Sequence, residues 1–450
     1  MSDERIADAL REATDTERVE VGSRVLSSAA RVFEQLFGDQ RAVVVADQNT
    51  FAAAGETVQR RLQAAGRAIE PFLFPGRPAL HAGYEHISEL ASALSDHEAI
   101  PVAVGSGTLN DIAKRASFER GRAYMNVCTA ASVDGYTAFG ASITRDGFKQ
   151  TMECSAPRAV LADLEVLTGA PAKMTSAGYA DLLAKIPAGA DWIVAEVLEV
   201  EPIEPRAWSL VQDGLREATG RPRELHEGDG AAMEELITGL ILSGLAMQAA
   251  SSSRPASGAE HQFSHLWEME GLGAAPADDE PPLSHGFKVG LGTVSIAALY
   301  QRVLERDLSR LDVDAVADTW PSWAEVERRI RSAFPSALAD SAVEQSRPKY
   351  IEAGRLTERL ALLRARWPQL RERLTAQLLP AERLRGQLQA AGCPTTPGEL
   401  GLDPDRFRET YHRAQMIRPR YTVLDLLNET ALLDECVGEL FAPGGFWNQE

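Results

Sequence analysis

The stretch "VAVGSGTLNDIAKRAS", residues 102–117, joins an apolar run to a helical pattern through Gly105, Ser106 and Gly107. A helix is predicted to open at Thr108 or Leu109. This junction is typical of nucleotide-binding α/β folds, because glycines let the backbone approach a pyrophosphate and the free N–H groups of the helix start can bind it. The spacing is not the G-x-G-x-x-G fingerprint, so a tight turn without a ligand is the alternative.

Residues 40–165, which surround this stretch, alternate short β-branched runs with helical runs. Strands are predicted at residues 42–47, 68–74, 99–107 and 122–132, with helices at 51–66 and 86–96. Such alternation predicts right-handed crossovers and a parallel sheet. After Pro171 helical periodicity dominates, and the Gly- and Pro-rich residues 271–286 are predicted to cross the surface. We expect a Rossmann-like α/β half at 1–168, an all-α half at 169–450 and a cleft between them.

Composition narrows the class of protein. A formal net charge of -19 without a basic stripe argues against nucleic acid and anionic membranes as partners. The four cysteines form no C-x-x-C pair, which favours a reducing compartment. The N-terminus has no apolar run typical of a signal peptide, and the uncharged residues 236–253 are rich in Ala, Ser and Gly, which favours a buried helix. A soluble cytoplasmic protein is expected.

Three histidines and one carboxylate suggest a metal site in the helical half. His261 and His265 in "SGAEHQFSH" (257–265) lie one helical turn apart, and His285 precedes an apolar run in "SHGFKVGLG" (284–292). Gln262 replaces the glutamate base of the H-E-x-x-H pattern. Asp181, in "SAGYADLLAKIPAGADW" (176–192), is either a helix cap or a ligand. Two histidines and one carboxylate are the ligand set of a catalytic Zn²⁺ or similar ion; structural histidines are the alternative.

Four stretches occur in an order that resembles the sn-glycerol-1-phosphate dehydrogenase family: "GSGTLNDIAK", "TAASVDG", "AGYADLLAKIPAGADW" and "SGAEHQFSH…SHGFKVGLG". This family belongs to a wider group of metal-dependent alcohol, glycerol and dehydroquinate-type enzymes. The resemblance runs from about Asp47 to the tail "IRPRYTVLDLL" at 417–427, which is similar to the bacterial branch.

The resemblance implies that Asp181, His261 and His285 bind a divalent metal, zinc foremost, with nickel or iron as alternatives. His265 then lies one turn along the helix and faces the substrate, so no glutamate base is needed. Asp134 matches the substrate-binding aspartate that follows "TAAS", and Asp181 contacts substrate as well as metal. Asp181 and His265 are therefore the catalytic candidates.

A nicotinamide dinucleotide, NAD(H) or NADP(H), is the second cofactor that the resemblance implies. The matching positions are Gly105, Ser106, Gly107, Thr108, Leu109, Thr129 and Ser132. Asp47, which ends the strand at 42–47, is expected either to bind ribose hydroxyls or to cap the next helix. The family usually has serine four positions after Asp134; here Ala138 removes a hydrogen bond worth about 0.5–1.5 kcal/mol to the dinucleotide.

The implied reaction is NAD(P)H-dependent reduction of dihydroxyacetone phosphate, a small phosphorylated triose, to sn-glycerol 1-phosphate. Lys149 and Lys185 are either phosphate contacts or solvated surface lysines. On the same fold, the alternatives are a related polyol or aldehyde reductase and a dehydroquinate synthase-like cyclase. A non-catalytic binding protein is an alternative of another class. The resemblance alone suggests a homodimer.

Overall fold

The computed structural model describes residues 2–145, 148–273 and 282–448. Within them, six parallel strands form one sheet in the order β1-β8-β5-β4-β2-β3. The strands are β1 (Arg18–Gly22), β2 (Ala42–Asp47), β3 (Phe72–Phe74), β4 (Ile100–Gly105), β5 (Met125–Cys128) and β8 (Ala159–Asp163). The α/β prediction is confirmed, and β2 has the predicted bounds. The sequence pattern misses β1 and β8, which extend the sheet on one side.

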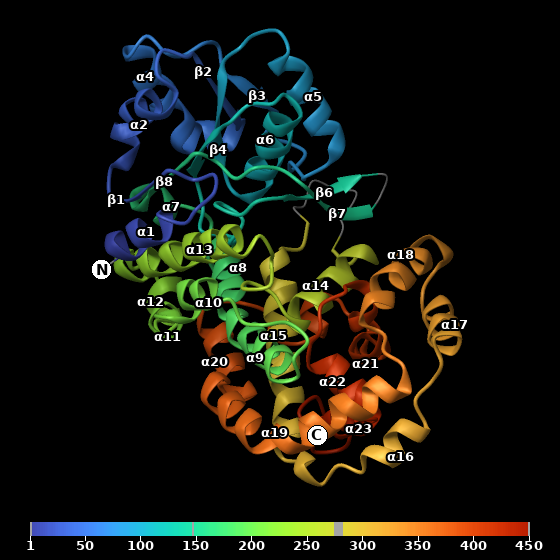
Figure 1. Cartoon of the computed structure of the whole chain (residues 1–450). Helices are drawn as coiled ribbons and strands as arrows, with labels where there is room; N and C mark the ends of the chain where they lie inside the picture. Colours follow the sequence, from blue (N-terminus) through green and yellow to red (C-terminus); the bar gives the residue numbers. More distant parts are fainter. Residues whose placement is uncertain (1, 146–147, 274–281, 449–450) are drawn as a thin grey trace.

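Helices cover both faces of this sheet (Figure 1). α2 (Ala29–Phe37) and α4 (Glu56–Ala64) share a hydrophobic core with Val44, whereas α5 (Tyr84–Leu94) and α6 (Gly107–Glu119) share one with Val43 and Val45. Alternate side chains of β2 therefore enter opposite layers. Burial on both faces explains why the strand reads as an unbroken apolar run.

The order in which successive strands are added to the sheet reverses between β2 and β4. β2 pairs with β3 on one side and with β4 on the other, and Val45 of β2 is in register with Ala103 of β4. Asp47 and Gly105 follow two residues later in each strand, so they lie side by side at the carboxyl edge. Ligands of open parallel sheets bind in the crevice at such a switch point.

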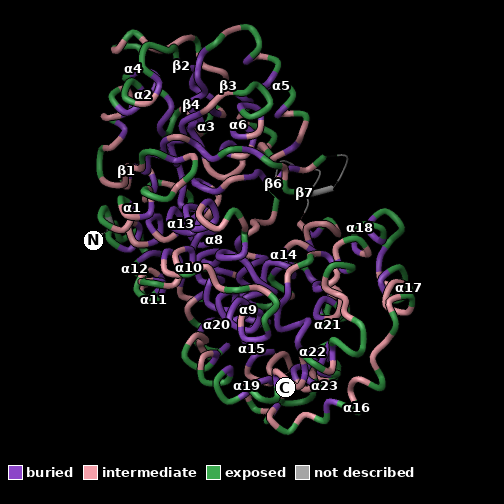
Figure 2. The backbone as a smooth tube through the Cα atoms, in the orientation of Figure 1, coloured by how far each residue is buried: buried purple, intermediate pink, exposed green. Residues whose placement is uncertain are grey.

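The C-terminal half is helical and lies below the sheet in the view of Figure 1. A close approach joins the halves: a Cβ added to Gly178 in α8 (Ala172–Leu183) would lie 2.0 Å from the carbonyl oxygen of Ala131, which follows β5. The backbone of α8 thus packs directly on the loop after β5. The long helices at the centre of this half are buried, as the purple trace in Figure 2 shows for α8, α9 and α15.

The remaining long helices form the body of this half. They are α9 (Lys185–Val197), α10 (Pro205–Gln212), α13 (Gly230–Ala250), α14 (Ala259–Met269), α15 (His285–Leu304), α17 (Trp323–Ala333), α18 (Ser336–Ser346), α19 (Ala353–Gln377), α20 (Ala381–Ala390), α21 (Pro404–Arg413) and α23 (Leu433–Phe441). Shorter helices complete it: α11 (Leu215–Ala218), α12 (Pro222–His226), α16 (Val313–Asp318) and α22 (Val423–Glu429). Two short helices of the N-terminal half, α1 (Ser2–Leu10) and α7 (Leu164–Thr168), contact α13.

α13 contains most of the uncharged run noted in the sequence. Among the described residues it is the one helix long and apolar enough to cross a membrane, but 72% of its apolar window is buried inside the protein. It is a core helix, as predicted. A two-stranded antiparallel hairpin, β6 (Ala141–Arg145) and β7 (Phe148–Met152), projects beside α14 (Figure 1). Of the predicted surface loop at 271–286, residues 274–281 lie outside the described residues.

Candidate active site

Asp181, His261 and His285 converge from three helices. Asp181 lies in α8, His261 in α14, and His285 is the first residue of α15. One ligand atom from each side chain lies within 4.8 Å of the others, and His261 Nε2 is 3.4 Å from Asp181 Oδ1. The structure therefore brings together the three residues proposed as metal ligands from the sequence. Asp181 lies inside its helix, so the alternative that it caps a helix is wrong.

The surroundings of this cluster fit a divalent metal. His261 Nδ1 lies 2.8 Å from Glu260 Oε1, and His285 Nδ1 lies 2.8 Å from Glu268 Oε1. Metal-binding histidines usually donate one ring N–H to a carboxylate, which fixes the tautomer and leaves the other nitrogen for the ion. Both rings therefore present Nε2, with one carboxylate, as a three-ligand set that leaves room for a substrate oxygen.

A second possible ligand group shares one member with the first. His265, Glu268 and His285 also offer atoms within 4.8 Å of one another. Glu268, however, already receives the Nζ of Lys288 at 3.2 Å in addition to the His285 ring. The Asp181 group is also more deeply buried. We therefore favour Asp181, His261 and His285. Another cluster, His81, Glu85 and His86, is largely exposed near the start of α5.

Lys185 joins the two aspartates of the site. Its Nζ lies 2.8 Å from Asp134 Oδ2 and 2.9 Å from Asp181 Oδ1, and its side chain has 0% exposure. The alternative that Lys185 is a solvated surface lysine is wrong. Burial by itself would raise the pKa of Asp181, but the charge of Lys185, followed by the neighbouring His261 ring, lowers that pKa below its ordinary value. The backbone N–H of Asp134 also donates to Asp181 Oδ2 over 3.0 Å.

A buried aspartate of α9 positions the histidine helix. Asp191 Oδ2 accepts the backbone N–H of Ala259, the first residue of α14, over 2.7 Å. Its Oδ1 accepts the backbone N–H of Val423, the first residue of α22, over 2.8 Å. Asp191 thus satisfies an otherwise unpaired N–H at two helix starts and fixes α14 relative to the segment before α22.

A pocket of about 250 Å³ opens beside the cluster of Asp181, His261 and His285, the proposed metal cluster. His261, Gln262 and His265 of α14 line it, together with Thr151 of β7. The rest of its wall comes from the loop after α13 and from the segment before α22: Ser252, Ser253, Ser257, Gly258, Arg418, Pro419 and Arg420, with Glu201 at one side. Residues of both halves of the chain therefore line the pocket, as the predicted cleft requires.

His265 faces this pocket as a neutral imidazole. Burial, followed by the charge of Arg418, lowers the pKa of His265 well below its ordinary value. Arg418 Nη2 donates to His265 Nδ1 over 3.4 Å, which leaves the ring proton on Nε2. Gln262, in the place of a glutamate base, instead donates to the carbonyl oxygen of Arg420 over 3.2 Å and so holds that segment against α14.

The residues matched to the dinucleotide lie at the carboxyl edge of the sheet. α6 begins at Gly107 with Ser106 before it, earlier than the predicted Thr108 or Leu109. The backbone N–H of Thr129 donates to the Gly105 carbonyl over 3.2 Å, so the two predicted segments run together.

Several of these positions also have a structural role. Asp47 caps the helix that follows β2, because its carboxylate accepts the N–H groups of Asn49 and Thr50. A Cβ on Gly105 would lie 2.4 Å from Leu109, so packing alone requires glycine there. The hydroxyl of Ser132 contacts the Tyr136 hydroxyl at 3.2 Å. Ala138 is buried, and its carbonyl oxygen accepts a hydrogen bond from Lys114 Nζ. The side chain of Lys149 lies outside the described residues.

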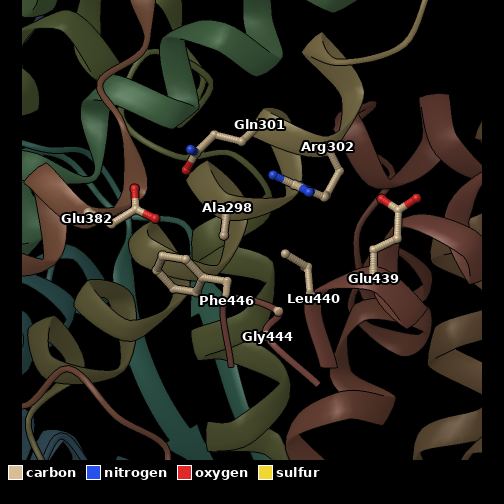
Figure 3. Close-up of a pocket in the computed structure, with 9 residues that line it drawn as sticks. Ala298, Gln301, Arg302, Glu382, Glu439, Leu440, Gly444 and Phe446 are labelled. Atoms are coloured by element: carbon tan, nitrogen blue, oxygen red, sulfur yellow. The ribbon is translucent and has the colours of Figure 1, made fainter. Parts of the chain in front are cut away.

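Another pocket, of about 150 Å³, lies far from this site (Figure 3). Arg302, Glu382, Glu439 and Phe446 line it. Arg302 is near the C-terminal end of α15, whereas His285 begins that helix, so about 25 Å of helix separates the two. The two carboxylates of this pocket, Glu382 and Glu439, disfavour an anionic substrate. This pocket plays no part in the site.

Comparisons with known proteins agree with the geometry. A family model described as iron-containing alcohol dehydrogenase matches residues 20–171. The NAD(P)+ glycerol-1-phosphate dehydrogenase of Bacillus velezensis is 31% identical over 393 residues, which cover 87% of this chain and 86% of the relative. That of Halalkalibacterium halodurans is 33% identical over 344 residues, 71% of this chain and 84% of the relative. The chain belongs to the glycerol-1-phosphate dehydrogenase family.

The family resemblance inferred from the motifs is thereby confirmed. The fold is confirmed by a crystal structure of a probable glycerol dehydrogenase from Sinorhizobium meliloti. This structure has a TM-score of 0.59 and 17% identity, and the match covers 94% of this chain and 97% of that one. Arg418 and Arg420 line the pocket but were not among the candidate site residues predicted from the sequence. The signal was present in "IRPR", two arginines around a proline directly before a helix start, but the residues of the pocket wall come together only in the fold.

Proposed function

We propose that the chain reduces dihydroxyacetone phosphate to sn-glycerol 1-phosphate, with a divalent metal and NADH or NADPH. The observation that carries this proposal is the cluster of Asp181, His261 and His285 beside a small polar pocket. Relatives named as glycerol-1-phosphate dehydrogenases, which match most of the chain, support the same substrate and cofactor. Zinc is the metal we propose first, because two imidazoles and one carboxylate with an open position suit it; nickel and iron are the alternatives.

Each residue of the site has a role in this proposal. When bound, the metal supplies a Lewis acid for the C2 carbonyl oxygen and the reduced nicotinamide supplies the hydride. Asp181, His261 and His285 hold the metal. Asp134 binds a substrate hydroxyl, and Lys185 orients Asp134 and Asp181 by bonding one carboxylate oxygen of each. His265 holds a proton at Nε2, from which it donates a hydrogen bond to the substrate oxygen that gains charge.

The dinucleotide is proposed to bind at the carboxyl edge of the sheet. Gly105, Ser106, Gly107, Thr108 and Leu109 would present the backbone N–H groups at the start of α6 to the pyrophosphate. Thr129 and Ser132 would line the same crevice. Asp47 Oδ1 caps the helix, and its Oδ2 would accept a hydrogen bond from a ribose hydroxyl. Further proposals are that residues 1–168 and 169–450 act as two domains, that the enzyme is cytoplasmic and that it forms a homodimer, with neither a membrane nor a nucleic acid as partner.

A substrate comparison tests the proposed reaction. The purified chain is loaded in turn with Zn²⁺, Ni²⁺ and Fe²⁺, and nicotinamide absorbance is followed with dihydroxyacetone phosphate or with dihydroxyacetone. Sustained NADH or NADPH oxidation with the phosphorylated ketone, yielding the sn-1 enantiomer of glycerol phosphate, is expected. A cyclase recycles its nicotinamide, so net oxidation excludes that alternative. The absence of turnover with every metal would overturn the proposal.

A further inference from the structure

We propose that Arg418 and Arg420 form the subsite that binds the phosphate of the substrate. This inference rests on the proposed function in one respect, since it takes the substrate to be a small phosphorylated ketone. It replaces Lys185, considered from the sequence as a phosphate contact, with two arginines of the pocket wall. Lys185 is fully buried and already bonded to two carboxylates, so it would have to break both contacts to reach a phosphate.

The two arginines come from a short extended segment before α22. Arg418 and Arg420 flank Pro419, and all three residues line the pocket that His261 and His265 also line. Its volume of about 250 Å³ is smaller than the roughly 300–1,000 Å³ typical of pockets for drug-sized ligands. It therefore suits a three-carbon phosphate ester rather than a dinucleotide, which leaves the sheet edge for the nicotinamide cofactor.

The hydrogen bonds of both guanidinium groups go to neutral partners. Arg420 Nη1 donates to the Ser257 carbonyl over 2.8 Å and to its hydroxyl, and Arg420 Nη2 donates to Ser253 Oγ over 2.8 Å. Arg418 donates to the Ile417 carbonyl over 3.5 Å and to His265 over 3.4 Å. In the part of the chain that the structure describes, neither arginine forms an ion pair with a carboxylate. The one carboxylate in the pocket wall, Glu201, is 3.3 Å from Arg254.

The resulting positive field favours an anion. Burial lowers the pKa of Arg418, and burial followed by the nearby charge of Arg254 lowers the pKa of Arg420 to about 10. Both groups stay protonated at neutral pH, and their charges are only partly compensated in a partly buried setting. A phosphate dianion would supply the missing charge and accept several charge-assisted hydrogen bonds, for which the planar guanidinium fork is well shaped.

The position of the pair relative to the metal cluster matches the substrate. His265 lies between Arg418 and the two histidines of the cluster. Its Nδ1 accepts from Arg418, and its ring centroid is 6.0 Å from that of His261 and 5.7 Å from that of His285. One imidazole therefore separates the guanidinium group from the metal ligands. In dihydroxyacetone phosphate, one methylene and one ester oxygen separate the reacting carbonyl from the phosphorus. A ligand with its carbonyl at the metal cluster places its phosphate at Arg418 and Arg420.

Binding of dihydroxyacetone phosphate to the zinc-loaded chain, measured by calorimetry, tests the subsite without requiring turnover. Arg418→Gln and Arg420→Gln should each weaken binding about 10- to 100-fold. The zinc content should not change. Binding of unphosphorylated dihydroxyacetone should not change in Arg420→Gln, since Arg420 bonds Ser253 and Ser257 rather than His265. In Arg418→Gln the loss of affinity should be larger for the phosphorylated ketone than for the unphosphorylated one, because Arg418 also orients His265. Arg302→Gln, in the distant pocket, is the matched control and should bind as the wild type does. Should Arg420→Gln fail to fold, Arg420→Lys, which keeps the charge but loses the fork, should still weaken binding.

The outcomes separate this inference from the proposed reaction. Undiminished affinity for dihydroxyacetone phosphate in Arg418→Gln and in the folded Arg420 variant would overturn the subsite, even if the wild type reduces this ketone. Arginine-dependent binding of inorganic phosphate or of another phosphate ester, in a chain that does not reduce dihydroxyacetone phosphate, would uphold the subsite and refute the proposed reaction. An equal loss of affinity for phosphorylated and unphosphorylated ketones would show that the arginines only shape the pocket, which also overturns the inference.

Discussion

Lys185 Nζ lies 2.9 Å from Asp181 Oδ1, one helical turn away at the junction of α8 and α9, and neither side chain is exposed. The same amino group bonds Asp134. The lysine thus places one positive charge between the buried carboxylate of Asp181 and the partly buried carboxylate of Asp134, next to the position where a divalent cation is proposed. Lys185 and the proposed metal would therefore both neutralise the negative charge of the same carboxylates.

Replacing Lys185 should destabilise the protein most strongly when metal is absent. Lys185→Met leaves the buried Asp181 and the partly buried Asp134 without their cation, and breaking a buried ion pair in this way costs about 3–5 kcal/mol. Added Zn²⁺ should restore more of the free energy of unfolding in the variant than in the wild type. Chemical denaturation with and without a chelator measures this. Lys173→Met, an exposed position on α8, is the control. Equal stability of both metal-free variants would contradict the account.

The carboxylate behind His261 should affect metal affinity without contacting the metal. Glu260 accepts from His261 Nδ1, so Glu260→Gln weakens the orientation and basicity of that ligand. Losing such a partner typically costs about 10- to 100-fold in metal affinity. Competition with a chromophoric chelator measures the dissociation constant for Zn²⁺, with the exposed Glu227→Gln as control. Unchanged zinc affinity in a folded Glu260→Gln protein would count against His261 as a ligand.

Glu429 should make stability depend on pH. Burial raises the pKa of Glu429 from 4.5 to about 7, against the opposing effects of Arg359 and Tyr421. Below pH 4.5 the carboxyl is protonated in both states. Between pH 4.5 and 7 only the unfolded chain releases the proton, so the free energy of unfolding falls as pH rises, by about 3 kcal/mol in total. Above pH 7 this contribution is constant.

The test is the free energy of unfolding as a function of pH in Glu429→Gln. An amide mimics the protonated carboxyl, so the decline between pH 4.5 and 7 should become shallower than in the wild type. Glu435→Gln, an exposed position on α23, should keep the wild-type slope. If the slopes of the Glu429 variant and the wild type coincide, Glu429 is already ionised across this range.

The sequence predicted those parts of the fold that depend on local pattern. β2, β4 and β5 are short apolar runs buried on both faces, and α13 is apolar all round, so composition alone identifies them. β1, with the pattern "RVEVG", has two charged residues among its five, Arg18 and Glu20, and is at most partly buried, so its signal is weak. Its place in the sheet depends on pairing with β8, more than a hundred residues later.

The site was predictable by residue type but not by contact. Histidine spacing within α14 places His261 and His265 on one face, and the ordered motifs supplied Asp181 and His285 as the other proposed metal ligands. The sequence could not show that Lys185 is buried between two carboxylates, because that depends on how α8, α9 and the loop after β5 meet. Nor could it show that Asp191 holds the starts of α14 and α22, or that Arg418 reaches a histidine 153 positions earlier.

The central claim is that Asp181, His261 and His285 bind one metal ion together. The zinc content of single variants, measured by elemental analysis after dialysis, tests this claim most directly. The measurement is best made in a His81→Ala background, which removes the exposed cluster on α5. The account predicts one ion per chain, its loss in Asp181→Asn, His261→Ala and His285→Ala, and its retention in His265→Ala. A full complement of zinc in folded Asp181→Asn or His261→Ala, with loss in His265→Ala, would place the ion on the other histidine group and contradict the account.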